Sequence, residues 1–246
     1  MNYIQTEIDG VWLIEPKVFH DARGYFMEAF KEEEFRAHVG NVHFIQDNES
    51  KSSFGVLRGL HYQKGDCSQA KLVRVIKGKV LDVAVDLRKS SPTFGKYVSV
   101  ELSEENKRQF FIPRGFAHGF LVLSDVAEFC YKCTDVYDPT SEGGIPYDDP
   151  TVNVQWPDCG CEHKTSAKDK LHESFAPRSL NSLKSGDRPW QKSRECSTAS
   201  GATAICCGIW SAVILSSSTA AACWAWCGAC STRCSCAWCT GPCSAA

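Results

Sequence analysis

The run Gly55-Val-Leu-Arg-Gly-Leu-His-Tyr-Gln63 has a cation and an imidazole three residues apart in an apolar segment typical of a β-strand. Side chains alternate between the two faces of a regular strand, so Arg58 and His61 would point in opposite directions. A glycine inside a strand often marks a bulge, and a bulge near Gly59 would bring both side chains to one cavity. The alternative is a surface arginine and a hydrogen-bonded core histidine.

On either side of this run, short apolar or alternating segments broken by Gly, Pro, Asp and Asn extend from Ile4 to about Pro157. This pattern is typical of antiparallel sheets and barrels. The predicted strands are Val11–Ile14, Phe44–Asn48, Val56–Tyr62, Lys71–Lys77, Val80–Leu87, Tyr97–Leu102, Arg108–Ile112, Ala117–Val122 and Glu128–Thr134. A short helix from about Ala29 to His38 is predicted to end at Gly40.

The composition is that of a soluble globular protein. Of the 246 residues, 23% are charged and 43% are hydrophobic, which is enough to bury a core. The formal net charge of -2 gives no general reason to expect a nucleic-acid or anionic-membrane partner, although a local basic pocket could bind phosphate. The first residues lack the basic and apolar regions of a signal peptide, so we expect a cytoplasmic location.

The 15 cysteines divide the chain. Those up to Cys161 lack the spacing of a disulfide framework and are expected to be reduced thiols, whereas the others are concentrated between Cys196 and Cys243. We therefore predict a folded domain at 1–175, a Ser, Lys, Arg and Pro-rich linker at 176–195, and a Cys, Ala, Ser and Trp-rich tail at 196–246.

Three interpretations of the tail remain open. The segment from Ala202 to about Trp226 is apolar enough for a membrane anchor, but Ser216-Ser-Ser-Thr219 interrupts it. Cys227-Gly-Ala-Cys230 and Cys236-Ala-Trp-Cys239 have the form of zinc ligands, but no His, Asp or Glu lies near them. We prefer a tail without a defined fold, such as the product of an out-of-frame reading past a truncated coding region.

The run Val80-Leu-Asp-Val-Ala-Val-Asp-Leu-Arg88 alternates as a strand does. One face is apolar and is expected to be core. On the other face we expect Asp86 and Arg88 to be solvated and Asp82 to line a polar cavity. In two other predicted strands, His118 and Tyr131 have the parity of apolar neighbours. Taken alone, a satisfied core histidine and a half-buried tyrosine are the simpler interpretation of these two positions.

The spacing Pro113-x-Gly115-x-x-His118 resembles the second sequence motif of the cupin superfamily of small β-barrels. The first cupin motif normally supplies two metal-binding histidines and a glutamate, whereas Leu60-His61-Tyr62-Gln63 offers one histidine. A metal site built from imidazole and carboxylate would be short of ligands, so we expect a barrel with metal-free chemistry.

A wider set of motifs is more specific. It comprises Phe19-His-Asp-Ala-Arg-Gly-Tyr-Phe-Met-Glu28, Gln46-Asp-Asn48, Val56-Leu-Arg-Gly-Leu-His-Tyr-Gln63, Lys71, Val83-Ala-Val-Asp-Leu-Arg88, Ile112-Pro-Arg-Gly-Phe-Ala-His-Gly-Phe120, Tyr131-Lys132 and Tyr137. In order and approximate spacing these blocks resemble the dTDP-4-dehydrorhamnose 3,5-epimerase family over about residues 2–175. The resemblance implies a cupin-type jelly-roll β-barrel with a few short helices, usually a homodimer, without metal or other cofactor. It also implies epimerisation at C3 and C5 of a dTDP-linked 4-keto-6-deoxy-hexose on the route to L-rhamnose.

The resemblance also implies roles for individual residues. His61 matches the general base of the family, and Tyr131 matches its general acid on the opposite face of the sugar. A proton next to a keto group becomes removable when the enolate oxygen is stabilised, and Arg58 and Lys71 match the family's cations beside the sugar. Asp169 resembles the carboxylate that orients the catalytic histidine, although the sequence before it departs from the family pattern.

Further positions match those that hold the nucleotide sugar in the family, namely Arg23, Glu28, Gln46, Asp47, Asn48, His118, Glu142 and Lys168. Arg23 suits a diphosphate, and Tyr137 matches the aromatic residue that stacks on thymine. Taken singly, such residues are more often solvated surface groups, so this prediction depends on their joint occurrence.

Three alternatives to a 3,5-epimerase remain. Some relatives invert only one carbon, which the sequence does not decide. A metal-dependent cupin oxygenase would contain stoichiometric metal and lose activity with a chelator. A non-catalytic protein, tethered through the tail, would bind the dTDP-sugar without turnover.

Overall fold

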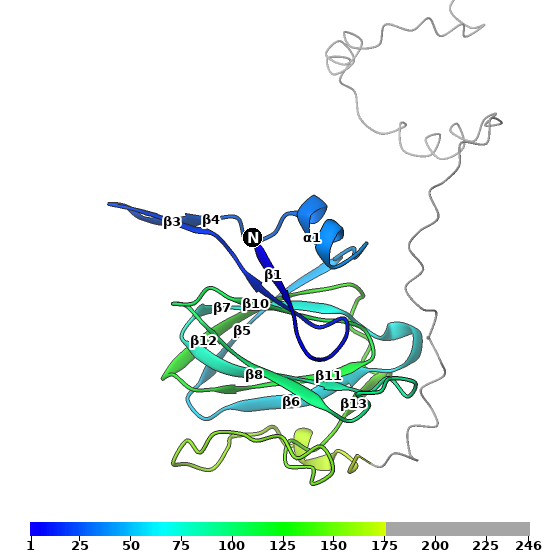
Figure 1. Ribbon diagram of the computed structural model, residues 1–246. Helices are drawn as coiled ribbons and strands as arrows, with labels where there is room; N and C mark the ends of the chain where they lie inside the picture. The colour runs from blue at the N-terminus through cyan, green and yellow to red at the C-terminus, as the bar shows by residue number, and fades with distance from the viewer. Residues whose placement is uncertain (176–246) are drawn as a thin grey trace, which may run out of the picture. The chain divides into compact units, whose positions relative to one another are not determined.

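A computed structural model describes residues 1–175 of the protein (Figure 1). Within this range two antiparallel sheets face each other, so the prediction of a mainly β, barrel-like fold is confirmed. The predicted linker at 176–195 and tail at 196–246 lie outside the described residues, as do the membrane-anchor and zinc-site interpretations of the tail. No helix between residues 1 and 175 is long and apolar enough to cross a membrane.

The two sheets are assembled from strands far apart in the sequence. The six-stranded sheet has the order β1 (Asn2–Gln5), β2 (Trp12–Glu15), β10 (Gln109–Ile112), β7 (Lys71–Lys77), β12 (Val126–Cys133) and β5 (Gln46–Ser53). The five-stranded sheet has the order β13 (Glu142–Gly144), β6 (Leu57–Gln63), β11 (Phe116–Val122), β8 (Lys79–Asp86) and β9 (Tyr97–Ser103). The remaining elements are the hairpin β3 (Val18–Asp21) and β4 (Gly24–Met27), the helix α1 (Glu32–His38), and the 3-10 helices η1 (Gly65–Cys67) and η2 (Asp169–Leu171).

Apolar side chains of both sheets meet in the space between them. Phe120 of β11 and Phe129 of β12 stack with their ring centroids 4.2 Å apart. Both rings belong to one buried cluster that includes Val73 of β7 and Val80 of β8. Burial of each such side chain contributes roughly 1.5–3 kcal/mol, so this cluster is a main tie between the sheets.

The central strands β8 and β11 are buried on both faces. On the outer face of their sheet, Val83 and Val85 pack beneath Ile145 and Val152, which belong to the segment 145–175. This segment runs along the outside of the five-stranded sheet and is drawn in green to yellow in Figure 1. The same segment carries the predicted carboxylate of the site, so its packing decides where that carboxylate lies.

The prediction that Asp86 is solvated is wrong. Asp86 is 0% exposed, and its carboxylate accepts hydrogen bonds from Arg88 Nε (2.9 Å), Ser91 Oγ (2.6 Å) and Thr93 Oγ1 (2.7 Å). Arg88 covers the carboxylate and lies over the ring of Phe116. The alternation predicted the strand correctly, but only the loop after β8 explains how a charged residue is satisfied in the interior.

Helix α1 begins at Glu32 rather than at the predicted Ala29. Lys31 has extended backbone angles, and the acidic residues Glu32 to Glu34 occupy the first turn, where the helix dipole favours carboxylates. The predicted end is confirmed, since Gly40 has a φ of 129° and leads the chain away. Phe35 of the helix packs edge-on against Phe111 of β10. The helix thereby covers the outside of the six-stranded sheet.

Strands β1, β3, β4 and β13 were not predicted. Each is three or four residues long, and none of their side chains is buried, so they have no core-facing pattern to be recognised. The hairpin β3–β4 projects away from the barrel (Figure 1). Its aromatic residues Phe19, Tyr25 and Phe26 are at least half exposed, at 50%, 52% and 66%.

Candidate active site

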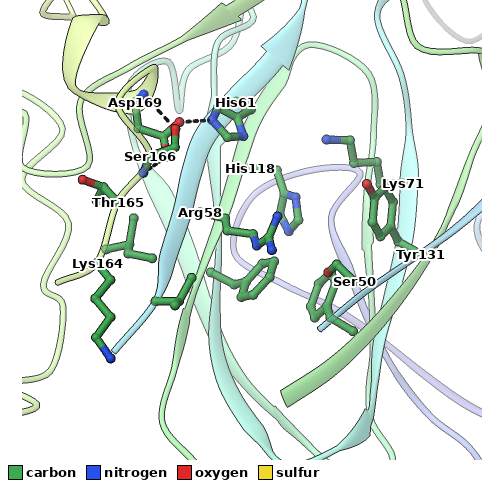
Figure 2. Close-up of a pocket in the computed structure, with 14 residues that line it drawn as sticks. Ser50, Arg58, His61, Lys71, His118, Tyr131, Lys164, Thr165, Ser166 and Asp169 are labelled. Carbon is green, nitrogen blue, oxygen red and sulfur yellow. Dashed lines mark hydrogen bonds and ion pairs between the residues drawn. The ribbon is translucent and has the colours of Figure 1, made fainter. Parts of the chain in front are cut away.

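A cavity of about 500 Å³ opens between the two sheets (Figure 2). From the five-stranded sheet, β6 contributes Arg58 and His61, and β11 contributes His118. From the six-stranded sheet, β7 contributes Lys71 and β12 contributes Tyr131. Polar residues from four strands, two in each sheet, therefore line one cavity.

Strand β6 is irregular near Gly59, which is one of the two alternatives that the sequence left open. His61 pairs with His118, but Arg58 pairs with Phe120, so β6 has one residue more than β11 over this interval. The extra residue shifts the alternation, and Arg58 and His61 line the same cavity. Gly59 has a φ of 134°, and a Cβ there would lie 2.5 Å from a backbone atom of β11. The bulge therefore requires glycine at this position.

His61 and Asp169 form a hydrogen-bonded pair. Nε2 of His61 lies 2.6 Å from Oδ1 of Asp169. Burial acts to raise the pKa of Asp169, but the hydrogen bonds from His61 and Ser166 outweigh it and hold the pKa below its usual value. Because a carboxylate can only accept, Nε2 carries the ring proton and Nδ1 keeps its lone pair. The imidazole is thus in the tautomer that a base acting through Nδ1 needs.

The segment before Asp169 follows the rim of the cavity. The backbone of Lys164 exchanges hydrogen bonds with Gly55 (2.8 Å) and Leu57 (3.0 Å) at the start of β6. Ser166 N–H donates to Oδ2 of Asp169, and Asp169 N–H donates to Oγ of Ser166, both at 3.2 Å. These contacts bring Asp169 to His61, although the preceding sequence departs from the family pattern.

Asp82 and His118 form a second pair, behind the wall of the cavity. Nε2 of His118 lies 3.0 Å from both carboxyl oxygens of Asp82, which is 0% exposed. Burial raises the pKa of Asp82 and lowers that of His118. Asp82 was expected to line the cavity itself, but it reaches the cavity only through His118.

Two cations enter the cavity from opposite sheets. Arg58 is held by a hydrogen bond from its Nε to Oγ of Ser52 (3.0 Å). Lys71 is more enclosed, and burial lowers the pKa of its amine. Figure 2 shows Lys71 beside Tyr131, on the wall across from His61. A negative charge that develops between these walls would therefore be close to positive groups.

Tyr131 is the phenol of this site. Burial raises its pKa, the neighbouring Cys133 raises it further, and Arg58 acts in the opposite direction. The hydroxyl therefore keeps its proton near neutral pH. It lies on β12, so the phenol and the imidazole of His61 enter the cavity from different sheets.

A second cavity of about 360 Å³ shares His61, Lys71 and Tyr131 with the first. It extends the site toward Gln46, Asn48, Tyr137 and Glu142. The Tyr137 hydroxyl and the Lys168 amine both donate to Oε2 of Glu142. Burial acts to raise the pKa of Glu142, but these two hydrogen bonds lower it overall. The two cavities together form an elongated site with a reactive part and a hydrogen-bonding part.

The sequence model of the dTDP-4-dehydrorhamnose 3,5-epimerase family matches residues 5–177. The chain belongs to this family. The prediction made from the sequence motifs is therefore confirmed, and so is the cupin-type fold.

Several members of the epimerase family are similar to the chain over most of their own length. The dTDP-4-dehydrorhamnose 3,5-epimerase of Shigella flexneri is 60% identical over 158 residues, which are 64% of this chain and 87% of that protein. The crystal structure of the Legionella pneumophila dTDP-6-deoxy-D-glucose-3,5-epimerase in complex with dTDP-4-keto-L-rhamnose is 52% identical, with a TM-score of 0.68 over 70% of this chain and 92% of that one. A 3'-monoepimerase from Streptomyces bikiniensis, in complex with dTDP-quinovose, is 35% identical, with a TM-score of 0.66 over 69% of this chain and 85% of that one.

Most site residues expected of an epimerase line one of the two cavities, namely Gln46, Asn48, Arg58, His61, Lys71, His118, Tyr131, Tyr137, Glu142 and Asp169. Lys168 joins them through Glu142. Arg23 and Glu28 do not line these cavities: both are exposed, and Arg23 pairs with Asp21 at the tip of the hairpin. Asp47 does not line either cavity, because strand alternation turns it outward, where it pairs with Lys132 (2.9 Å).

The sequence motifs did not reveal every residue of the site. Ser50, Thr165 and Ser166 line the first cavity, and Ser52 holds Arg58. Their small hydroxyl side chains give no local signal of a site. His172 follows η2 and lies close to Asp169, but it lines neither cavity.

Proposed function

We propose that the protein epimerises dTDP-4-dehydro-6-deoxy-D-glucose at C3 and C5 to dTDP-4-dehydro-L-rhamnose, in dTDP-L-rhamnose biosynthesis. The observation that carries the proposal is the arrangement of His61 and Tyr131 on different walls of one cavity, with Arg58 and Lys71 beside them. The family relationship supports the class of substrate, since a relative binds dTDP-4-keto-L-rhamnose.

Proton removal is assigned to His61. The protons at C3 and C5 flank the 4-keto carbon, so loss of either leaves an electron pair that is delocalised onto the carbonyl oxygen. Nδ1 of His61 takes the proton, and the resulting imidazolium is stabilised by the carboxylate of Asp169 (2.6 Å). Asp169 therefore also fixes which nitrogen acts as the base.

The enolate is stabilised by the two cations. Its negative charge lies on the oxygen at C4, and Arg58 and Lys71 present fixed positive groups to the same cavity. Because these side chains are already ordered by the walls, they need little rearrangement when the charge develops. The two cations therefore lower the free energy of the enolate more than that of the neutral ketone.

The new proton comes from Tyr131. Its phenol protonates the enolate carbon on the face opposite His61, which inverts the configuration. The tyrosinate then regains a proton from solvent, and the imidazolium loses one to solvent. Each inversion thus exchanges one carbon-bound hydrogen with water.

The nucleotide part of the substrate is assigned to the second cavity. Gln46, Asn48 and Glu142 offer hydrogen-bonding groups there, and the half-exposed ring of Tyr137 is available for stacking on thymine. The elongated site thus suits a sugar attached to a nucleotide better than a free sugar.

A homodimer would explain the position of Arg23. The hairpin β3–β4 carries Arg23 beyond its own barrel together with Phe19 and Phe26, which are exposed. A second copy would cover these aromatic rings and bring Arg23 to the diphosphate in the partner's site.

An epimerase that inverts only one carbon is the second candidate. A 35% identical relative is a 3'-monoepimerase, so the fold can serve either reaction. The activity is attributed to residues 1–175, and the cytoplasmic location stays a prediction from the sequence.

Deuterium exchange tests both candidates. The protein is incubated with dTDP-4-keto-6-deoxyglucose in heavy water, and the sugar is analysed by mass spectrometry and proton NMR. We expect deuterium at both C3 and C5, whereas uptake at one carbon would identify the single-carbon enzyme. Full retention of both protons by folded protein would reject the proposed function.

A further inference from the structure

His172 lies against the His61–Asp169 pair, and the proposed reaction does not use it. Its ring meets that of His61 edge-on, with centroids 5.7 Å apart, and its Nε2 lies 3.9 Å from Oδ1 of Asp169. The side chain is only 11% exposed. It fits there because residue 144 is glycine: a Cβ on Gly144 would lie 2.2 Å from Nε2 of His172.

The Nε2 atom of His172 is buried and has no hydrogen-bond partner among residues 1–175. A buried polar atom without a partner is costly, and a native structure seldom keeps one without a reason. The polar groups beside it are the carboxylate of Asp169 and the imidazole of His61. One possible ligand atom from each of the three residues lies within 4.8 Å of the other two. A cation that accepts a lone pair from each of the three side chains would satisfy all three at once.

We propose that His61, Asp169 and His172 form a binding site for a divalent transition-metal ion, for which zinc is the best candidate. Two imidazoles and one carboxylate are the ligands zinc takes, at distances of about 2.0–2.2 Å. Tetrahedral geometry at those lengths separates neighbouring ligand atoms by roughly 3.3 Å. The observed distances from Asp169 Oδ1, 2.6 Å to His61 and 3.9 Å to His172, lie on either side of that value. Magnesium and calcium prefer oxygen ligands and fit this site poorly.

The ion would inhibit the proposed reaction. Zinc bound to Nε2 of His61 takes the lone pair of that nitrogen, so the ring proton must move to Nδ1. His61 can then no longer accept a proton through Nδ1. This consequence rests on the proposed function, whereas binding of the ion does not.

The test follows the histidine rings of the full-length protein by NMR, with free Zn²⁺ fixed by a chelator buffer so that the 15 cysteines do not change it. The protein has seven histidines, and their ring signals are assigned with single substitutions. We expect the signals of His61 and His172 to shift together in one saturable transition. His172→Gln should raise the free zinc needed to shift His61 at least about tenfold, because loss of an outer partner alone costs 10- to 100-fold. His43→Gln, at an exposed histidine that lines neither cavity, is the matched control.

Epimerase turnover is measured in the same zinc buffers. In the unchanged protein and in His43→Gln, the free zinc concentration that halves turnover should equal the one that half-fills the site. In His172→Gln and His172→Asn both concentrations should rise together. Both His172 variants should retain turnover without zinc. The proposal is overturned if the two ring signals stay fixed as zinc rises, or if both His172 variants keep the same midpoint. If turnover is missing without zinc, the proposed function fails, while the ring signals still decide the metal site.

Discussion

Nε2 of His61 lies 2.6 Å from Oδ1 of Asp169, although 108 positions separate the two residues in the chain. His61 belongs to strand β6, and Asp169 begins the 3-10 helix η2 at the end of the segment that covers the outer face of the same sheet. The pair therefore forms only when that segment has packed onto the barrel. Packing of the last described residues therefore positions the carboxylate that orients the proposed base.

Replacement of Asp169 by asparagine tests the role of this pair. An amide can offer its NH₂ group to Nε2, which favours the tautomer with the proton on Nδ1 and removes the base. We expect kcat for the proposed epimerisation to fall at least about 100-fold, with a smaller change in KM. Steady-state kinetics check this, with Asp158→Asn, an exposed position in the same segment, as control. An Asp169→Asn enzyme with unchanged kcat would show that the carboxylate does not direct the base.

The alternating patterns revealed most strands and left a bulge as one of two alternatives for β6, because these features depend on neighbouring residues. The pattern at 80–88 identified strand β8, and Gly59 marked the irregularity in β6. What the patterns could not reveal is which loop covers which face. Asp86 was expected in solvent because its partners Ser91 and Thr93 follow in a loop whose return to the strand has no periodic signal.

Site residues could be predicted where their segments match motifs of a known family. They could not be predicted where only the fold brings them to the site. His61 and Tyr131 were found because their segments match a known family, whereas no local property of either residue indicates that they face each other across the barrel. Asp47 shows the converse, since it lies within a matching motif but on the outward side of β5. His172 gave no signal, because its proximity to Asp169 depends on the turn of η2 and on the space beside Gly144.

Tyr131→Phe should separate proton removal from inversion. The ring remains to fill the cavity, but its acidic proton is lost, while His61 and Asp169 are untouched. We expect exchange of the substrate protons with heavy water to continue, and formation of the inverted product to fall about 100-fold or more. Comparison of deuterium uptake with product formation checks this. Equal losses in exchange and inversion would contradict an acid role for Tyr131.

Lys71→Met should slow the reaction without weakening the fold. Methionine keeps the apolar stem but removes the charge that stabilises the enolate, so kcat should fall about 10²- to 10³-fold. Because burial already lowers the pKa of the Lys71 amine, its removal should leave the free energy of unfolding unchanged or raise it. Kinetics and urea unfolding check the two parts. Lys77→Met, at the exposed end of the same strand, is the matched control and should keep its activity. A Lys71→Met enzyme with the same kcat as that control would argue against the assignment.

Mixing two inactive variants tests whether Arg23 serves the partner's site. Arg23→Ala removes the proposed diphosphate contact, and His61→Ala removes the base. In a mixed dimer, the subunit with Arg23→Ala retains His61 and receives Arg23 from its partner, so one site becomes complete. We expect activity to appear after the two proteins are unfolded together and refolded, above the level of either variant treated alone. No recovery in a mixture shown by mass spectrometry to contain mixed dimers would mean that Arg23 acts within its own chain, if it acts at all.

Asp149→Asn should destabilise the protein in a pH-dependent manner. The buried carboxylate of Asp149 accepts hydrogen bonds from Ser174 Oγ and Phe175 N–H, both at 2.6 Å, and from the backbone at Thr151 and Val152. Burial acts to raise its pKa, but these hydrogen bonds outweigh burial and lower the pKa overall. The contact therefore anchors the segment that brings Asp169 to His61.

The sign of the pH effect follows from the lowered pKa. The unfolded chain, with a carboxyl pKa of about 3.9, takes up the proton before the folded protein does. The stabilisation is therefore fully present above that pH and is lost as the pH falls below it. We expect Asp149→Asn to lower the free energy of unfolding at pH 7 by about 1.5–3 kcal/mol, and the difference from the unchanged protein to shrink as the pH falls from about 5 to below 4. Urea unfolding under reducing conditions across this range checks it, with the exposed Asp148→Asn as control. A difference that stays constant down to the lowest pH at which the protein folds would mean that the charge of Asp149 does not hold the segment in place.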